Sequence, residues 1–307
     1  MRSISDKGAV ILKNYKTPLK LAALLLLCAL LLLCARVGEK KAAAAIQYPA
    51  IPASAEDFQR RYAYLVPTAR DQEDQLPLTV MDIDLSAVNG DLVLSEGGDY
   101  RLTGRLRGSI RINAPEDHVH LFLDEAEVQA IYGPALYCSD ADKLVITLLP
   151  GTENRFSDSG SYPADSEAEA CVYSACSMTI NGGGNLAVNG LYKDCVRSKD
   201  VLKLLGTGEY TLRCKRSAFH GNDGIYANNG VYFISSEKYG LKTTRKGADG
   251  RGDLILAGGE WNLLVGRYSF VTTMADLVVY NCKVYHNSVI ALYDVGGRAV
   301  IDQGCVQ

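Results

Sequence analysis

Basic side chains are concentrated between residues 190 and 252, where twelve Lys and Arg residues outnumber the acids. Arg197, His220 and Lys242 occupy the same place in three similar short segments. If those segments are neighbouring strands of one sheet, their side chains form a column about 4.8 Å apart. Such a column suits the carboxylates or phosphates of an extended polymer, and the alternative is a solvated charged edge. The predicted carbohydrate-binding residues are Arg197, Lys199, Lys215, His220, Lys242 and Arg245, with Tyr173 and Tyr192 as sugar-stacking rings.

Acidic residues near this column are candidate calcium ligands, namely Asp194, Asp200 and Asp223. Calcium takes six to eight oxygen ligands, so one carboxylate per coil is a small donor set. Calcium therefore remains one alternative, and capping of turns by these carboxylates is the other. Hydrolysis of a glycosidic bond needs two carboxylates across a cleft, and no such pair stands out. We predict no catalytic residue.

A repeat of apolar residues indicates the elements that position these side chains. Its spacings are 36, 24, 23, 22, 29 and 20 residues, with short apolar bursts separated by glycine. A period in the low twenties is typical of stacked coils. Parallel strands in an ordinary sheet need helical crossovers, which this chain lacks, whereas coils do not. We predict an all-β parallel β-helix (solenoid) over residues 79–307, with a β-sandwich as the alternative. The anchors are Leu136, Val172, Val196, Phe219, Leu241, Phe270 and Ile290.

The N-terminal region carries a targeting signal. Residues 21–35 are apolar and uncharged, and the segment before them is basic. Basic residues on one side of an apolar helix keep that side in the cytoplasm. We predict a cytoplasmic stretch and signal-anchor transmembrane helix over 1–45, an extracellular linker or cap over 46–78, and a single-pass cell-membrane protein with an extracellular C-terminal domain. A cleaved signal and a lipoprotein are the alternatives.

The remaining composition narrows the partners. The net charge is −3, which argues against nucleic acid as a partner. Seven of the nine cysteines follow the apolar segment, so they cannot all pair within one chain. Cys171 and Cys195 occupy equivalent places in neighbouring repeats, and we expect buried, reduced thiols there rather than a disulfide framework.

Two ordered motifs carry a family resemblance. Residues 144–158 include Ile-Thr-Leu-Leu-Pro-Gly-Thr-Glu-Asn-Arg-Phe-Ser-Asp, and residues 178–200 include Asn-Gly-Gly-Gly-Asn-Leu-Ala-Val-Asn-Gly-Leu-Tyr-Lys-Asp. This pattern resembles a bacterial surface family of carbohydrate-binding domain-containing proteins. The resemblance implies a right-handed parallel β-helix, shaped like a pectate lyase, that binds polysaccharide and calcium. The family's repeated Asp-Gly-Ile step is reduced here, because only Asp194 keeps the acid among the equivalent positions.

These observations together predict non-catalytic binding of polysaccharide, with acidic glycan favoured, by a lateral face of the β-helix at the outer cell surface. The polymer and the membrane are the expected partners. The alternatives are a structural module of the cell envelope that contacts another protein, and a calcium-dependent polysaccharide lyase.

Overall fold

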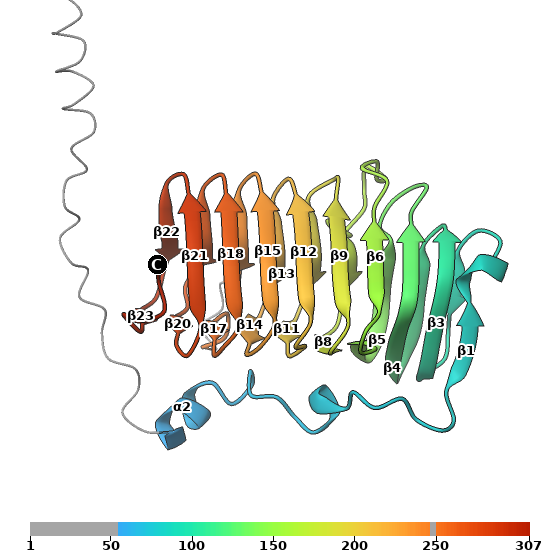
Figure 1. Cartoon of the computed structure of the whole chain (residues 1–307), viewed down its shortest axis with the longest axis horizontal. Helices are drawn as coiled ribbons and strands as arrows, with labels where there is room; N and C mark the ends of the chain where they lie inside the picture. The colour runs from blue at the N-terminus through green and yellow to red at the C-terminus, as the bar shows by residue number, and fades with distance from the viewer. Residues whose placement is uncertain (1–54, 246–249) are drawn as a thin grey trace, which may run out of the picture. The chain divides into compact units, whose positions relative to one another are not determined.

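The repeat corresponds to the coils of a β-solenoid. The structure is a computed structural model, and it describes residues 55–245 and 250–307. Contacts divide the chain into Met1–Gln47 and Tyr48–Gln307, and every described residue belongs to the second unit. The helical fraction of the described residues is small, and the strands pair with parallel neighbours one coil away. The prediction of an all-β parallel solenoid is therefore confirmed (Figure 1).

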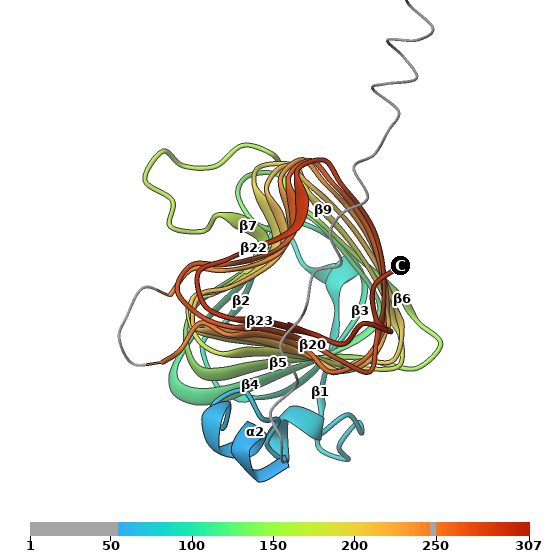
Figure 2. The same ribbon diagram turned by 90° about the vertical axis from the view of Figure 1, so that its left-hand side faces the viewer.

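Each coil contributes strands to three lateral faces, which Figure 2 shows in a view from the end of the solenoid. Face 1 contains the first parts of β4 (Ile110–Gln129) and β5 (Leu136–Leu148) together with β2 (Leu92–Leu94), β7 (Ala170–Ser174), β10 (Asp194–Ser198), β13 (Ser217–Gly221), β16 (Tyr239–Thr243), β19 (Tyr268–Thr272) and β22 (Ala291–Val295). Face 2 contains the start of β3 (Gly98–Arg107), the middle of β4 and the end of β5 together with β1 (Met81–Asp84), β8 (Met178–Gly182), β11 (Val201–Leu204), β14 (Gly224–Ala227), β17 (Leu254–Leu256), β20 (Leu277–Val279) and β23 (Ala299–Ile301). Face 3 contains the ends of β3 and β4 together with β6 (Glu153–Ser157), β9 (Asn185–Gly190), β12 (Glu209–Cys214), β15 (Val231–Ser236), β18 (Glu260–Val265) and β21 (Lys283–Ser288).

The inside of the coils is one continuous apolar core. Inward side chains of equivalent strands stack along the solenoid, as do the rings of Tyr210, Tyr232 and Trp261, whose centroids lie 4.7 and 3.8 Å apart. Cys171 and Cys195 are both fully buried in this core at equivalent places, as predicted. The core is thus built by repetition, and each coil contacts its neighbours.

The glycine run after β8 forms the tight corner between faces 2 and 3. Gly182 has a φ of +89°, and a Cβ added there would lie 2.2 Å from the carbonyl oxygen of Leu148 in the coil below. Gly184 is equally close to its neighbour, at 2.3 Å from the carbonyl oxygen of Leu149. Only glycine permits both the left-handed backbone and this close approach.

The predicted anchors align in register, with one exception. Leu136, Val172, Val196, Phe219, Leu241 and Phe270 each pair with the next in this series on face 1. The last anchor was wrong, because Phe270 pairs with Tyr293, while Ile290 lies 57% exposed at the preceding turn. The strand there carries Tyr293 at the anchor position, and because its ring bears a hydroxyl, a search for wholly apolar residues selects Ile290 of the turn instead.

An N-terminal segment, residues 55–78, lies along the outside of face 2, and we call it the strap. It includes α2 (Ala55–Arg61) and the 3-10 helix η1 (Arg70–Gln72); a further 3-10 turn, η2 (Leu85–Ala87), follows β1. Figure 1 shows the strap running below the strands from the β20 end to β1. Its Tyr62 and Leu65 are fully buried in a small apolar cluster with outward residues of face 2 such as Ile255 and Val278. The strap therefore covers one side of the solenoid.

A buried carboxylate fixes the strap near its centre. Asp71 is inaccessible to solvent and pairs with the ammonium groups of Lys143 and Lys203 on face 2, at 2.8 Å for Lys203. It also accepts a hydrogen bond from Thr179 at 2.5 Å. Burial raises the pKa of this carboxyl, but the hydrogen bonds from the two lysines outweigh it and hold the pKa well below its ordinary value.

The predicted signal-anchor helix falls within residues 1–45, outside the described residues. Within the described part of the chain, no helix has the length and apolar character needed to cross a membrane.

Candidate functional sites on two faces of the solenoid

The predicted basic column exists on face 1. Tyr173, Arg197, His220 and Lys242 follow one another in register on β7, β10, β13 and β16, so this part of the prediction is confirmed. Their accessibility differs from what a ligand column needs. Tyr173 is 1% exposed and His220 is 4% exposed, and the Arg197 side chain is 13% exposed. Tyr173 and His220 thus lie beneath other residues and offer no surface to a polymer.

A glutamate from a neighbouring loop covers the centre of this column. Glu169 accepts hydrogen bonds from Lys193 at 2.6 Å, Arg197 at 2.5 Å and Arg216 at 2.8 Å. Burial raises the pKa of the Glu169 carboxyl, but the bonds from Lys193 and Arg216 outweigh it and bring the pKa to about 2. These three cations are therefore already bonded to a carboxylate of the protein.

Asp194, predicted as a calcium ligand, is committed to other partners. It is fully buried, accepts two hydrogen bonds from Arg216 at 2.7 and 2.6 Å, and lies 3.0 Å from Nδ1 of His220. Burial opposes ionisation, but the bonds from Arg216 and His220 hold the pKa of Asp194 well below its ordinary value. Burial in turn lowers the pKa of His220, which favours the neutral ring with a proton on Nδ1.

The other two predicted calcium ligands, Asp200 and Asp223, are also bonded to side chains of the protein. Asp200 accepts a hydrogen bond from Ser177 at 2.6 Å, and Asp223 pairs with Arg245 at 3.2 Å. Among the described residues, no group of three or more His, Cys, Asp or Glu side chains could hold a metal ion. Since calcium needs many oxygen donors, this donor set does not fit it.

The remaining predicted residues are scattered around the basic column. Lys199 pairs with Glu167 at 2.5 Å, and Lys215 is exposed at the corner between faces 3 and 1. The Lys242 ammonium lies 4.8 Å from the ring centroid of Tyr239. Tyr192 stacks on Tyr162 with centroids 4.2 Å apart, so its ring supports a loop. The structure therefore brings these residues to one region, but it does not form an open cationic groove from them.

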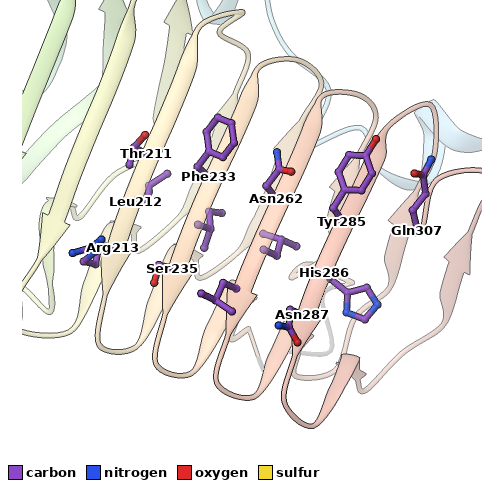
Figure 3. A pocket seen from close by; sticks show the side chains of 13 residues that line it. Thr211, Leu212, Arg213, Phe233, Ser235, Asn262, Tyr285, His286, Asn287 and Gln307 are labelled. Atoms are coloured by element: carbon purple, nitrogen blue, oxygen red, sulfur yellow. The ribbon is translucent and has the colours of Figure 1, made fainter. Parts of the chain in front are cut away.

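An open surface that the sequence analysis missed lies on face 3. The outward residues of β12, β15, β18 and β21 form two rows along the solenoid, and we call this surface the platform (Figure 3). A hollow of about 570 Å³ lies over it. The first row contains Thr211, Phe233, Asn262 and Tyr285, and the second contains Arg213, Ser235, Leu264 and Asn287.

The platform combines apolar faces with a free polar group. Phe233 is 43% exposed and Leu264 is 57% exposed, which is unusual for large apolar side chains in the middle of a sheet. Phe233 and Tyr285 are separated by Asn262, hence by two strand spacings or about 9.6 Å. The Nδ2 atom of Asn262 is buried and has no hydrogen-bond partner among the described residues. Aromatic faces flanking a partly exposed amide side chain can hold a flat ligand that carries hydroxyl groups.

A second hollow, of about 450 Å³, extends the platform toward the corner of the coil. It shares Arg213, Ser235 and Leu264 with the first and adds exposed residues of the corner such as Leu191 and Val289. The open surface therefore extends both along the solenoid and toward the corner of the coil. In the sequence, the platform could have been found from the alternation of inward apolar and outward residues in β12, β15 and β18. These three segments can be aligned in the same way as the face 1 anchors.

The chain is thus a parallel β-solenoid with one face covered by the strap and one open face that carries aromatic rings. Comparison with known proteins specifies this further. The family model of the carbohydrate-binding domain-containing protein matches residues 89–285, which is 197 of the 307 residues. The chain belongs to this family, and all four strands of the platform lie within the matched region except the last residues of β21.

Two individual proteins resemble this chain. A carbohydrate-binding domain-containing protein of Acetivibrio thermocellus is 29% identical over 135 residues, which is 42% of this chain. The matched part is 47% of that relative, so this chain spans about half of its length. The solved structure of the polysaccharide lyase-like protein from C. thermocellum, a gadolinium derivative, has a TM-score of 0.70 and covers 74% of this chain and 98% of its own. Its sequence is 22% identical, so the likeness concerns the fold.

Proposed function

We propose that this protein binds polysaccharide without cleaving it, and that the platform on face 3 is the binding surface. The observation that carries the proposal is the arrangement of Phe233, Asn262 and Tyr285 on adjacent strands. The rings stack on the apolar faces of sugar residues, and the partly exposed side chain of Asn262 forms a hydrogen bond with a hydroxyl between them. Membership of the carbohydrate-binding family supports this assignment.

The direction of the rows favours a polymer over a single sugar. Because the strands stack in register along the solenoid, a chain that lies across them meets one outward side chain of each row at each step of about 4.8 Å. Thr211 to Tyr285 spans four strands in this direction. A monosaccharide would contact one ring and leave the rest of the surface exposed.

Charge on the platform favours a polymer that is neutral or carries few acids. Arg213 is the charged side chain among the residues that line the larger hollow, and it lies at one edge. A guanidinium there can bind an occasional carboxylate of the polymer. We keep the outer cell surface as the proposed location, because a basic segment precedes the apolar residues 21–35.

Binding to a panel of cellulose-, xylan- and mannan-like polymers tests the proposal. We expect Phe233→Ala and Tyr285→Ala each to weaken binding about tenfold, the factor that corresponds to 1.4 kcal/mol. Asn262→Ala should also weaken binding, since a hydrogen bond typically contributes about 1 kcal/mol. Tyr132→Ala is a matched control, because this ring is 52% exposed and lies outside the platform. Unchanged binding in the Phe233 and Tyr285 variants, or an equal loss in the control, would exclude the platform.

A further inference from the structure

The loop between β6 and β7 is an addition to the regular coil. It comprises residues 158–169, whereas the equivalent corner between β9 and β10 comprises residues 191–193 and that between β12 and β13 comprises 215–216. Figure 2 shows this loop projecting from the coil beside β7. Since a corner of two or three residues closes the coil elsewhere, the extra residues are not needed for the fold.

This loop places two glutamates on a group of four basic side chains, which we call the cationic cluster: Lys193, Arg197, Lys199 and Arg216. Glu169 contacts three of them, at 2.5 to 2.8 Å, and Glu167 contacts Lys199 at 2.5 Å. A single carboxylate that receives three cations is the geometry expected of an anion seated in a binding site.

A count of charges shows what the loop supplies. The cationic cluster has four positive charges, and its carboxylates are Asp194, Glu167 and Glu169. Asp194 is buried on β10 and remains whatever the loop does. Without the two glutamates, four cations would face one carboxylate, and partly buried cations without partners are costly. The Nε atom of Arg197, which is buried and has no hydrogen-bond partner among the described residues, leaves a further donor to be used.

The two ends of the loop are held differently. Near its start, Tyr162 stacks on Tyr192 and donates a hydrogen bond to the buried Asp158 at 2.9 Å. Near its end, the pair of Glu167 with Lys199 is exposed, with side-chain exposures of 70% and 37%, and exposed pairs contribute little to stability. A hollow of about 250 Å³ lies between this part of the loop and Tyr137 of β5. The backbone carbonyl of Glu169 accepts a hydrogen bond from the Asp194 amide at 3.0 Å, so the end of the loop is also held. The two glutamates can therefore leave the cations by rotation of their side chains, without movement of the loop backbone.

We propose that the cationic cluster is a second polysaccharide site, specific for polymers that carry carboxylate or sulfate groups, and that Glu167 and Glu169 occupy it as internal substitutes for the ligand. An acidic chain binds by displacing the two glutamates and inherits their ion pairs with Arg197, Lys199 and the neighbouring cations. Glu167 and Glu169 are two positions apart in the chain, so their Cα atoms lie at most about 7 Å from each other. The displaced carboxylates therefore correspond to acidic groups on nearby sugars.

Removal of the two internal carboxylates is the direct test. Polygalacturonate and dextran sulfate serve as carboxylate and sulfate probes, with neutral dextran as the uncharged comparison. We expect the Glu167→Gln/Glu169→Gln variant to bind an acidic probe several-fold tighter than the parent protein, with a gain that falls as salt is raised. The probe that shows the larger gain identifies the acidic group. Asp165→Asn is the matched control, because Asp165 is an exposed acid of the same loop.

Two further variants separate ligand displacement from a change in folding. Adding Arg197→Gln and Lys199→Gln to the double variant should remove the gain. Glu167→Gln alone, which alters only an exposed pair, should retain the melting temperature and show a smaller gain. Equal or weaker binding of both acidic probes by the double variant, or a gain matched by Asp165→Asn, would overturn the proposal. Binding of neutral polymers to the platform is measured separately and does not depend on this outcome.

Discussion

At the scale of single residues, His120 links stability to pH. Its side chain is 2% exposed, stacks on Phe122 and lies 2.7 Å from the hydroxyl of Thr147. Burial lowers the pKa of His120 to about 4. The imidazole of His120 takes up a proton near pH 6.5 in the unfolded chain but only near pH 4 in the folded protein. Acidification from pH 6.5 to pH 4 therefore favours unfolding, and by pH 4 it lowers the free energy of unfolding by about 3 kcal/mol. We expect His120→Gln to show a shallower loss of stability on acidification, measured by urea unfolding at several pH values.

The matched control is His286→Gln, whose ring is half-buried in a terminal strand, and this change should alter the pH dependence less. A parent protein whose free energy of unfolding is flat from about pH 7 to about pH 4 would contradict the role given to His120.

The sequence predicted where the site residues lie in the strands better than it predicted whether their side chains are exposed to solvent. The register of Arg197, His220 and Lys242 follows from local spacing, because each coil repeats the one before it. The burial of Tyr173 and His220 depends on long-range contacts made by loop and corner residues, which periodicity does not report. Conversely, the apolar side chain of Phe233 is typical of a core residue. Only its position as the third residue of β15, where inward and outward side chains alternate, indicates that it points outward.

At the scale of elements, the strap contributes stability through its apolar contacts. Leu65 is fully buried between the strap and face 2, and replacing a buried leucine by alanine typically costs about 2–5 kcal/mol. We expect Leu65→Ala to lower the free energy of unfolding by about that amount and to increase binding of an apolar fluorescent dye as Ile255 and Val278 become accessible. Urea unfolding and dye fluorescence measure the two effects.

Gln59→Ala is the control for the strap, because Gln59 is an exposed residue of α2. If Leu65→Ala behaves like this control, the strap is not packed on face 2 in solution. The strap could not be placed from the sequence, since its many charged and polar residues are equally typical of a free linker. The partners that fix it, such as Lys143 and Lys203, lie far away along the chain.

At the scale of the whole molecule, the sequence predicts the solenoid well because its repeats are consistent with one another. Each anchor pairs with the next, so an error at one position, such as Ile290, leaves the remaining register intact. The loop 158–169 interrupts the repeat, and its length gives no information on where its glutamates bind. Periodic features are therefore predictable here, and inserted ones are not.

A solenoid of this kind should lose structure first at its ends. In β10 and β13 nearly every residue is buried between neighbouring coils, whereas most residues of β21 and β22 are partly or fully exposed and have a full coil on one side. Stability in stacked repeats is a sum of contacts between neighbours, so terminal coils open at lower free energy. We expect backbone amides of β21 and β22 to exchange with deuterium faster than those of β10 and β13, as measured by mass spectrometry of peptides. Uniform exchange across all coils would mean that the solenoid unfolds as a single unit, and the platform, which ends on β21, would then be as rigid as the centre.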